Sequence, residues 1–445
     1  MIATLVAAAV HFAMRIHRPL AALLLAVFPS AAHAQVADTS VKLTLSFDHA
    51  DWLYEVGDTA RYRVSLTRAG KPIPGAKVRV VFAQERLKAL RTDTIDLSQG
   101  ERTLSGALPF PGFLRATATA AIDGATYTAL GTAGFSPERL TPGVTAPDDL
   151  MAFWQKAIAD ARRTPLMSTM TRLPQYSTPE VDAYHVSFQN NRANSRIYGM
   201  LAVPTRPGKY PAMLVVPGAG VRPYFPSIAT AKKGVIHLAI GIHGIPVDRD
   251  SLLYNELRAT ALQSYWAYGV EDRDLYYYKR VYVGVVRAGD FIASLPQFDG
   301  TNYVVQGGSQ GGGLSIVAGV LDPRVKAIAV THPAMADHFG YLKGQPGGWP
   351  HIFQDTAGMR ALPEKMETLR YYDAVNFARL LRVPGIYTWG FNDNTVPPTA
   401  SYVTYNVISA PKEMFTVPET GHFRVPSQVA RMDAWLLDKL GVHSP

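Results

Sequence analysis

The stretch QGGSQGGG (residues 306–313) decides the fold, because it places one serine among glycines and glutamines between two apolar runs. Within it, GGSQG (307–311) fits G-x-S-x-G, the pattern of a serine exposed on a sharp strand-to-helix turn. Side chains two residues before or after that serine would collide with the turn, so the chemistry requires glycine at both positions. The alternative is an ordinary glycine-rich linker, and the rest of the chain has to decide between them.

If this strand-to-helix turn is a nucleophile elbow, a catalytic base has to lie downstream of Ser309. A serine hydroxyl becomes nucleophilic when a histidine takes its proton and an acid orients that histidine. In hydrolases with this elbow the chain order is serine, acid, histidine. Five of the twelve histidines follow Ser309. His422, in a loop after the apolar stretch 414–417, is the predicted base, whereas His443 lies too close to the C-terminal end to hold a fixed position.

The predicted acid is Asp393, which lies in a turn-rich loop after the apolar stretch 385–390. The competing acids have simpler interpretations, such as capping a helix or facing solvent. The acids weighed against it are Asp322, Asp337, Asp355 and Asp373.

Two backbone N–H groups have to bind the oxyanion of a tetrahedral intermediate. The residue after the nucleophile supplies one, which here is Gln310. The loop after the apolar stretch 212–218 would supply the other, at Ala219 or Gly220. An ordinary tight turn is the alternative interpretation of that loop.

Alternating strand and helix patterns fill residues 147–443 and predict a mostly parallel sheet with helices on both faces. With the G-x-S-x-G turn at 307–311, this arrangement is typical of an α/β-hydrolase fold. A helix is expected over 148–163, with Asp148 and Asp149 in its first turn. A second helical pattern covers 282–295. The expected strands are 212–218, 235–242, 303–307, 325–331 and 385–390.

Residues 36–140 predict a second domain, a small all-β sandwich of the immunoglobulin-like kind. Apolar and polar residues alternate over 41–47, 60–66 and 76–82, and Asp123-Gly124 is a strong hairpin signal. A proline-rich joint, 136–147, separates this domain from the next. The domain could be a structural spacer or could contact carbohydrate or a partner.

The first 34 residues predict a cleaved signal peptide, with Met1 or Met14 as its start. Arg15 and Arg18 precede a short apolar core (20–28), and Ala32-His33-Ala34 gives the A-x-A cleavage pattern. The core is too short for a membrane span. We therefore expect a periplasmic or secreted protein without a membrane span. The absence of cysteine excludes disulfides and thiolate chemistry.

Charge and the remaining polar clusters indicate neither nucleic acid nor metal as a ligand. The net charge of +9 comes from scattered rather than clustered basic residues. The spacing of His332, Asp337 and His338 does not place three ligands on one helix face, so neither a metal nor another cofactor is expected. His243 is expected to be a hydrogen-bonded structural histidine. The tyrosines of 275–282 are expected in the core and the pocket wall.

Four stretches resemble the acetyl xylan esterase and cephalosporin C deacetylase family of α/β-hydrolases, and they occur in the family's order. They are DRDLYYYKRVYVGVVRAGDFIASLPQFD, GGSQGGGLSIVAGVLDPRVKA, YYDAVNFARLLRVPGIYTWGFNDNTVPP and APKEMFTVPETGH. The resemblance covers most of residues 147–440. The chain departs from the family at Ala219, where a tyrosine is usual, and at Phe423, where a glutamate is usual.

The resemblance implies removal of acetyl groups from acetylated xylan or xylo-oligosaccharides. It implies Ser309 as nucleophile, Asp393 as acid, His422 as base, and Gln310 and Ala219 as oxyanion donors. The expected substrate is a small acetylated carbohydrate or another ester. The sequence leaves open whether the chain forms a homo-oligomer. The alternatives are a deacylase of other small esters, an oligopeptidase-like hydrolase, or a non-catalytic polysaccharide-binding protein on a hydrolase scaffold.

Overall fold

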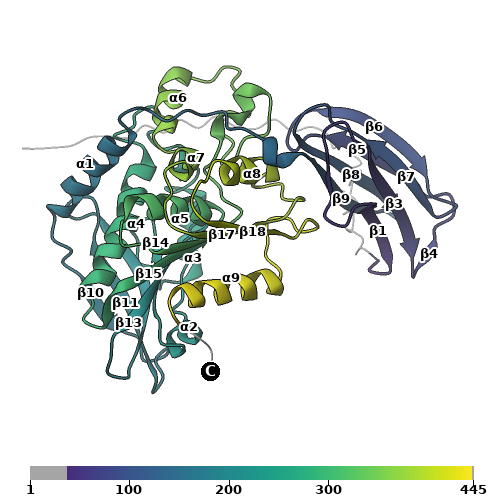
Figure 1. Cartoon of the computed structure of the whole chain (residues 1–445). Helices are drawn as coiled ribbons and strands as arrows, with labels where there is room; N and C mark the ends of the chain where they lie inside the picture. The colour runs from purple at the N-terminus through teal and green to yellow at the C-terminus, as the bar shows by residue number, and fades with distance from the viewer. Residues whose placement is uncertain (1–37, 443–445) are drawn as a thin grey trace, which may run out of the picture.

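The computed structural model describes residues 38–442, and Figure 1 shows two units, a smaller one of strands and a larger one of strands and helices. The predicted signal peptide (1–34) and His443 lie outside the described residues. Between 38 and 442, no helix combines the length and the apolar character that a membrane crossing demands.

The smaller unit contains two sheets that enclose one hydrophobic core. One sheet has the order β1-β3-β4, with β7 also paired to β3, and the other has the order β2-β9-β8-β5-β6. Tyr62 and Val64 from the first sheet pack against Val80 and Phe82 from the second. The strands are β1 Val41–Phe47, β2 Leu53–Tyr54, β3 Ala60–Arg68, β4 Lys71–Pro72, β5 Lys77–Ala83, β6 Ala89–Asp96, β7 Glu101–Gly106, β8 Gly112–Ile122 and β9 Ala125–Phe135.

The predicted hairpin at Asp123-Gly124 is confirmed. Ile122 of β8 pairs directly with Ala125 of β9 in antiparallel register, so the turn has two residues. Asp123 has φ 50° and Gly124 has φ 79°, as a two-residue hairpin turn with both central residues in the left-handed region requires.

The larger unit is built on a nine-stranded sheet with the order β10-β11-β12-β14-β13-β15-β16-β17-β18. From β14 to β18 neighbouring strands are parallel, whereas β10, β11, β12 and β14 pair antiparallel. The strands are β10 Thr169–Arg172, β11 Val181–Gln189, β12 Arg196–Pro204, β13 Tyr210–Val216, β14 Ile236–Gly241, β15 Phe298–Gly308, β16 Ala327–Thr331, β17 Gly385–Trp389 and β18 Lys412–Thr416.

Helices cover both faces of this sheet, as the alternating pattern predicts (Figure 1). The α4 and α5 side packs against strand residues such as Leu214 and Val305, and the α9 side packs against Met213 and Val304. The helices are α1 Leu150–Arg162, α2 Ile228–Lys232, α3 Ser251–Ala259, α4 Tyr277–Ser294, α5 Gln310–Leu321, α6 Leu362–Arg370, α7 Ala374–Ala378, α8 Pro398–Asn406 and α9 Pro426–Lys439, with short 3₁₀ turns η1 Pro137–Arg139, η2 Tyr265–Ala267 and η3 His338–Lys343.

Two expectations need correction. Helix α1 begins at Leu150, so Asp148 and Asp149 precede it instead of lying in its first turn, and Asp149 makes no side-chain cap. The antiparallel strands β10 to β12 were not predicted, although only β10 is exposed along its whole length, whereas β11 and β12 are mostly buried.

The strand order explains where a site can form. The chain runs from β13 outward to β14 on one side and then returns to place β15 on the other side of β13. The loops after β13 and β15 therefore diverge at the carboxyl ends of these strands, which is where open α/β sheets bind ligands.

Candidate active site

Ser309 lies between the last residue of β15, Gly308, and the first residue of α5, Gln310. Its backbone has φ 60° and ψ −127°, a region that costs of order 1–3 kcal/mol for a residue with a Cβ. A Cβ on Gly307 would lie 2.4 Å from the carbonyl oxygen of Gly311, and a Cβ on Gly311 would lie 2.4 Å from that of Val216. The predicted collisions on both sides of the serine are thus confirmed, and the linker interpretation is wrong.

Alanine substitutions at the elbow glycines should reduce stability where a new Cβ meets backbone atoms and have little effect where there is space for it. We expect Gly311→Ala to destabilise the fold by about 1–3 kcal/mol or more, because backbone atoms cannot yield as a flexible side chain can. Gly308→Ala is the matched control: its new Cβ would meet nothing closer than 3.6 Å. Chemical denaturation of both variants measures the difference. Equal stability of the two would contradict the elbow packing.

The three residues predicted as the triad meet at the carboxyl ends of the parallel strands. His422 Nε2 lies 3.0 Å from Ser309 Oγ, and His422 Nδ1 lies 2.7 Å from Asp393 Oδ2. Asp393 follows β17 and His422 follows β18, so all three come from loops after strands of the parallel part of the sheet. Ser309 Oγ and His422 Nε2 lie within the hydrogen-bond reach that proton transfer between them requires.

The carboxylate of Asp393 is fully buried, and its two oxygens have different hydrogen-bond partners. Its Oδ1 accepts the N–H groups of Thr395 and Val396, both at 2.8 Å. Its Oδ2 faces His422. The loop backbone thus fixes the carboxylate so that one oxygen remains for the imidazole.

A second histidine, His332, lies beside this pair and was not predicted there. Its Nδ1 is 3.3 Å from Asp393 Oδ2, and its ring centroid is 5.0 Å from that of His422. Among residues 38–442, neither ring nitrogen of His332 has a hydrogen-bond partner. Burial lowers the pKa of His332 to about 4, so the ring is neutral near pH 7. Within residues 38–442 it makes no hydrogen bond with Ser309, whereas His422 does.

Ligand atoms of His332, Asp393 and His422 all lie within 4.8 Å of one another, close enough for one metal ion. The hydrogen bond between His422 and Asp393 already engages two of these three groups. The trio considered from the sequence is different: Asp337 instead accepts the N–H of Gly143 at 2.6 Å, which is a structural role.

The side chain of Gln310 joins the elbow to the loop after β13. Its Oε1 accepts hydrogen bonds from Tyr265 at 2.6 Å and from Tyr278 at 2.7 Å, and its Nε2 donates to Pro217 O at 3.1 Å. Gly220 N donates to the Tyr265 hydroxyl at 3.4 Å. Of the two candidate donors in this loop, Ala219 N makes no hydrogen bond within residues 38–442, and Ala219 lines the same cavity as Ser309.

His243 supports the same loop, as expected of a structural histidine. Its Nε2 lies 3.1 Å from Gly220 O and its Nδ1 lies 2.8 Å from the Tyr277 hydroxyl. A carbonyl can accept but not donate, so Nε2 carries the proton and Nδ1 accepts from Tyr277. Burial lowers the pKa of His243 to about 4, which keeps this neutral tautomer near pH 7.

Removing the side chain of Gln310 should loosen the donor loop without deleting a backbone donor. We expect Gln310→Ala to lower kcat about ten- to hundred-fold, because small misplacements of a donor carry costs of this size. Two tyrosine hydroxyls would also lose their acceptor, at about 1–3 kcal/mol of stability each. Steady-state kinetics on a small ester and a denaturation curve measure both effects. An unchanged kcat would show that the loop holds its position without Gln310.

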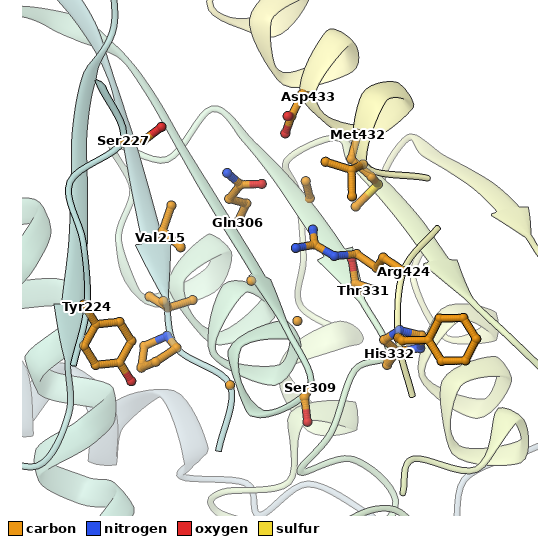
Figure 2. Close-up of a pocket in the computed structure, with 18 of the residues that line it drawn as sticks. Val215, Tyr224, Ser227, Gln306, Ser309, Thr331, His332, Arg424, Met432 and Asp433 are labelled. Atoms are coloured by element: carbon orange, nitrogen blue, oxygen red, sulfur yellow. The ribbon is translucent and has the colours of Figure 1, made fainter. Parts of the chain in front are cut away.

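Ser309 lines a cavity of about 770 Å³. Figure 2 shows Ser309 at one end, Gln306 and Thr331 on the strands of the floor, Tyr224 on one side, and Arg424 and Asp433 on the other. Met432 and Val215 contribute apolar contacts. The cavity therefore combines the Ser309 hydroxyl with polar groups that can hydrogen-bond hydroxyls and charges.

The sheet order, the elbow after β15 and the loops that follow β17 and β18 define an α/β-hydrolase. The family model described as acetyl xylan esterase (AXE1) matches residues 138–439. The chain is 40% identical over 396 residues to the acetyl esterase Axe7A of Xylanibacter ruminicola, covering 87% of this chain and 88% of that protein. The chain therefore belongs to the acetyl xylan esterase family and is a carboxylic ester hydrolase.

Solved structures show the same fold for the larger unit. An acetyl xylan esterase from Paenibacillus sp. R4 superimposes with a TM-score of 0.60 at 24% identity, covering 68% of this chain and 98% of that one. Acetyl xylan esterase 1 from Thermoanaerobacterium sp. JW/SL YS485 gives 0.60 at 19%, with 68% and 97% covered. The match to Axe7A is long enough to extend into the residues before 138, so that relative shares part of the smaller unit as well.

Proposed function

We propose that this chain is an exported serine esterase that removes acetyl groups from acetylated xylan or xylo-oligosaccharides. The observation that carries the proposal is the line from Ser309 Oγ through His422 to Asp393, with distances of 3.0 and 2.7 Å. Family membership and the similarity to an acetyl esterase support acetyl as the acyl group that is transferred to the serine and then released as acetate.

In the first half-reaction, Ser309 Oγ attacks the ester carbonyl carbon while His422 Nε2 takes its proton. The carbonyl oxygen becomes an oxyanion that accepts hydrogen bonds from the N–H groups of Gln310 and Ala219. When the intermediate collapses, the bond to the sugar oxygen breaks and His422 returns the proton to that oxygen. The acetyl group is then bonded to Ser309.

In the second half-reaction, water replaces the sugar. His422 takes a proton from the water, whose oxygen attacks the acyl carbon, and the same two N–H groups bind the new oxyanion. Collapse breaks the bond to Ser309 Oγ, which receives the proton, and acetate leaves. Asp393 keeps the imidazole in the tautomer with Nδ1 protonated throughout.

The polar cavity supports a carbohydrate as the group that carries the ester. Gln306, Thr331, Arg424 and Asp433 offer hydrogen bonds beyond the serine. Acetyl is small, so most of the 770 Å³ would be filled by the sugar and not by the acyl chain.

The decisive experiment compares acyl chains and sugars. We expect acetate release from acetylated xylan and faster hydrolysis of p-nitrophenyl acetate than of longer acyl esters. A preference for longer acyl chains would favour a general deacylase, and cleavage of short peptides would favour an oligopeptidase-like hydrolase. Binding of xylan without any hydrolysis would favour a non-catalytic polysaccharide-binding protein.

Three further parts of the proposal are export, the kind of accessory domain and the oligomeric state. The basic and apolar pattern before Gln35 supports export by a cleaved signal, and strands β1 to β9 support an immunoglobulin-like sandwich as the accessory domain. Detection of the chain in the periplasm or medium, with an N-terminus at Gln35, tests the first. Sedimentation of the purified protein tests whether it forms a homo-oligomer.

A further inference from the structure

We propose that the N-terminal all-β unit is a working part of the active site, in which Arg115 of β8 is a positioning residue for the loop that carries Asp393. This inference rests on the proposed role of Asp393 as the triad acid. It assigns to the all-β unit a task other than that of a spacer or a carbohydrate-binding module.

Arg115 reaches from the smaller unit into the backbone of the acid loop. Its Nη2 donates to the carbonyl oxygens of Phe391 at 2.8 Å and of Asp393 itself at 3.0 Å, and its Nη1 bonds the side chain of Asn394. Its Nε is held by Thr132 Oγ1 at 2.8 Å. Arg115 is 5% exposed, so these hydrogen bonds are shielded from water.

A second connection runs beside the first. The Thr132 hydroxyl donates to Asn392 Oδ1 at 2.9 Å, and Asn392 Nδ2 donates to Leu130 O of β9 at 3.2 Å and to Glu419 O at 3.3 Å. Glu419 belongs to the loop that carries His422. One asparagine next to the triad acid thus ties together the all-β unit, the acid loop and the histidine loop.

Two carboxyl groups lie close enough to act on the charge of Arg115, Glu85 of the all-β unit and Asp393. Glu85 is 1% exposed, and this burial raises its pKa to about 7; it accepts hydrogen bonds from Thr399 at the start of α8. The rings of Phe113 and Phe391 pack edge to face at 5.1 Å just beside it. A guanidinium suits this place because its planar fork bonds several oxygens at once, which a lysine cannot reproduce.

A second contact between the two units makes it possible to separate positioning of the acid loop from simple docking of one unit on the other. Asn406 of α8 donates to Pro137 O and Leu140 O, both at 3.0 Å, and so also joins the larger unit to the segment that leads out of β9. Within residues 38–442, its side chain makes no hydrogen bond with the acid loop. If Arg115 only fastened the two units together, loss of either contact would affect the enzyme in the same way.

The test compares Arg115→Ala, Arg115→Lys and Thr132→Val with the control Asn406→Ala in the full chain. We expect kcat for p-nitrophenyl acetate to fall about ten- to hundred-fold in the Arg115 variants, with KM changed less than about twofold. We expect a smaller fall in Thr132→Val and none in Asn406→Ala. Millimolar guanidinium should restore part of the kcat of Arg115→Ala, whereas methylammonium should not.

Three results would overturn the proposal: an Arg115→Ala enzyme with wild-type kcat, an equal loss in Asn406→Ala, or a rise in KM alone. Thermal melting checks that each variant is folded. If Arg115→Ala does not fold, Arg115→Lys and Thr132→Val decide the question, since both keep the interface filled. Asp393→Asn is measured alongside: full activity in that variant would instead refute the proposed triad, whatever Arg115 does.

Discussion

We expect Ser309→Ala to lower kcat for p-nitrophenyl acetate by about 10⁴- to 10⁶-fold, the largest effect of any single change in this chain. The Oγ atom 3.0 Å from His422 Nε2 is the proposed nucleophile, and an alanine there leaves no atom to bond the acyl carbon. The remaining rate would come from the oxyanion donors and the bound geometry. Initial rates over a wide range of enzyme concentrations, with contaminating esterase excluded, measure it.

The matched control is Ser315→Ala, a serine six residues further along, within α5. Its hydroxyl donates to Gly311 O at 2.9 Å and does not face the cavity, so we expect near wild-type activity. Melting curves for both variants exclude unfolding as the cause of a loss. A Ser309→Ala enzyme as fast as Ser315→Ala would remove Ser309 from the reaction.

The sequence was sufficient to predict Ser309, Asp393 and His422 because the required order of serine, acid and histidine along the chain leaves few candidates. The elbow pattern at 307–311 is common by itself, but it requires a strand before and a helix after, and both are present as β15 and α5. Requiring an acid and then a histidine in loops after later strands left Asp393 and His422, and the structure brings both to Ser309. Each step used a local pattern together with a rule of parallel sheets.

The parts that could not be predicted are those that depend on contacts between distant segments. His332 directly follows β16, but nothing in the sequence places it against Asp393. Tyr265 belongs to the long connection between β14 and α4, and nothing in the sequence places its hydroxyl against Gln310, to which it donates a hydrogen bond. Arg115 precedes Asp393 by 278 residues and lies in another unit, so its contact appears with the folded chain alone.

We expect Asp393→Asn to lower kcat about 10⁴-fold, which corresponds to about 5.5 kcal/mol of transition-state stabilisation. The reason lies in how the carboxylate is held. Thr395 and Val396 donate N–H groups to Oδ1, so an asparagine would place its own oxygen there and turn its NH₂ group toward His422. That NH₂ group donates to Nδ1 and forces the proton onto Nε2, the atom that has to accept the proton of Ser309. The imidazole would keep its place but hold the wrong tautomer.

The control for this prediction is Asp355→Asn, the same isosteric change at an exposed acid that caps Ala357 N and lies outside the cavity. It should leave kcat and KM unchanged. If the tautomer argument is correct, Asp393→Ala should be less impaired than Asp393→Asn, because an empty space lets His422 adopt either tautomer while an amide enforces the inactive one. Stronger impairment of Asp393→Ala would mean that the negative charge of Asp393, and not its control of the tautomer, is its main contribution to the rate.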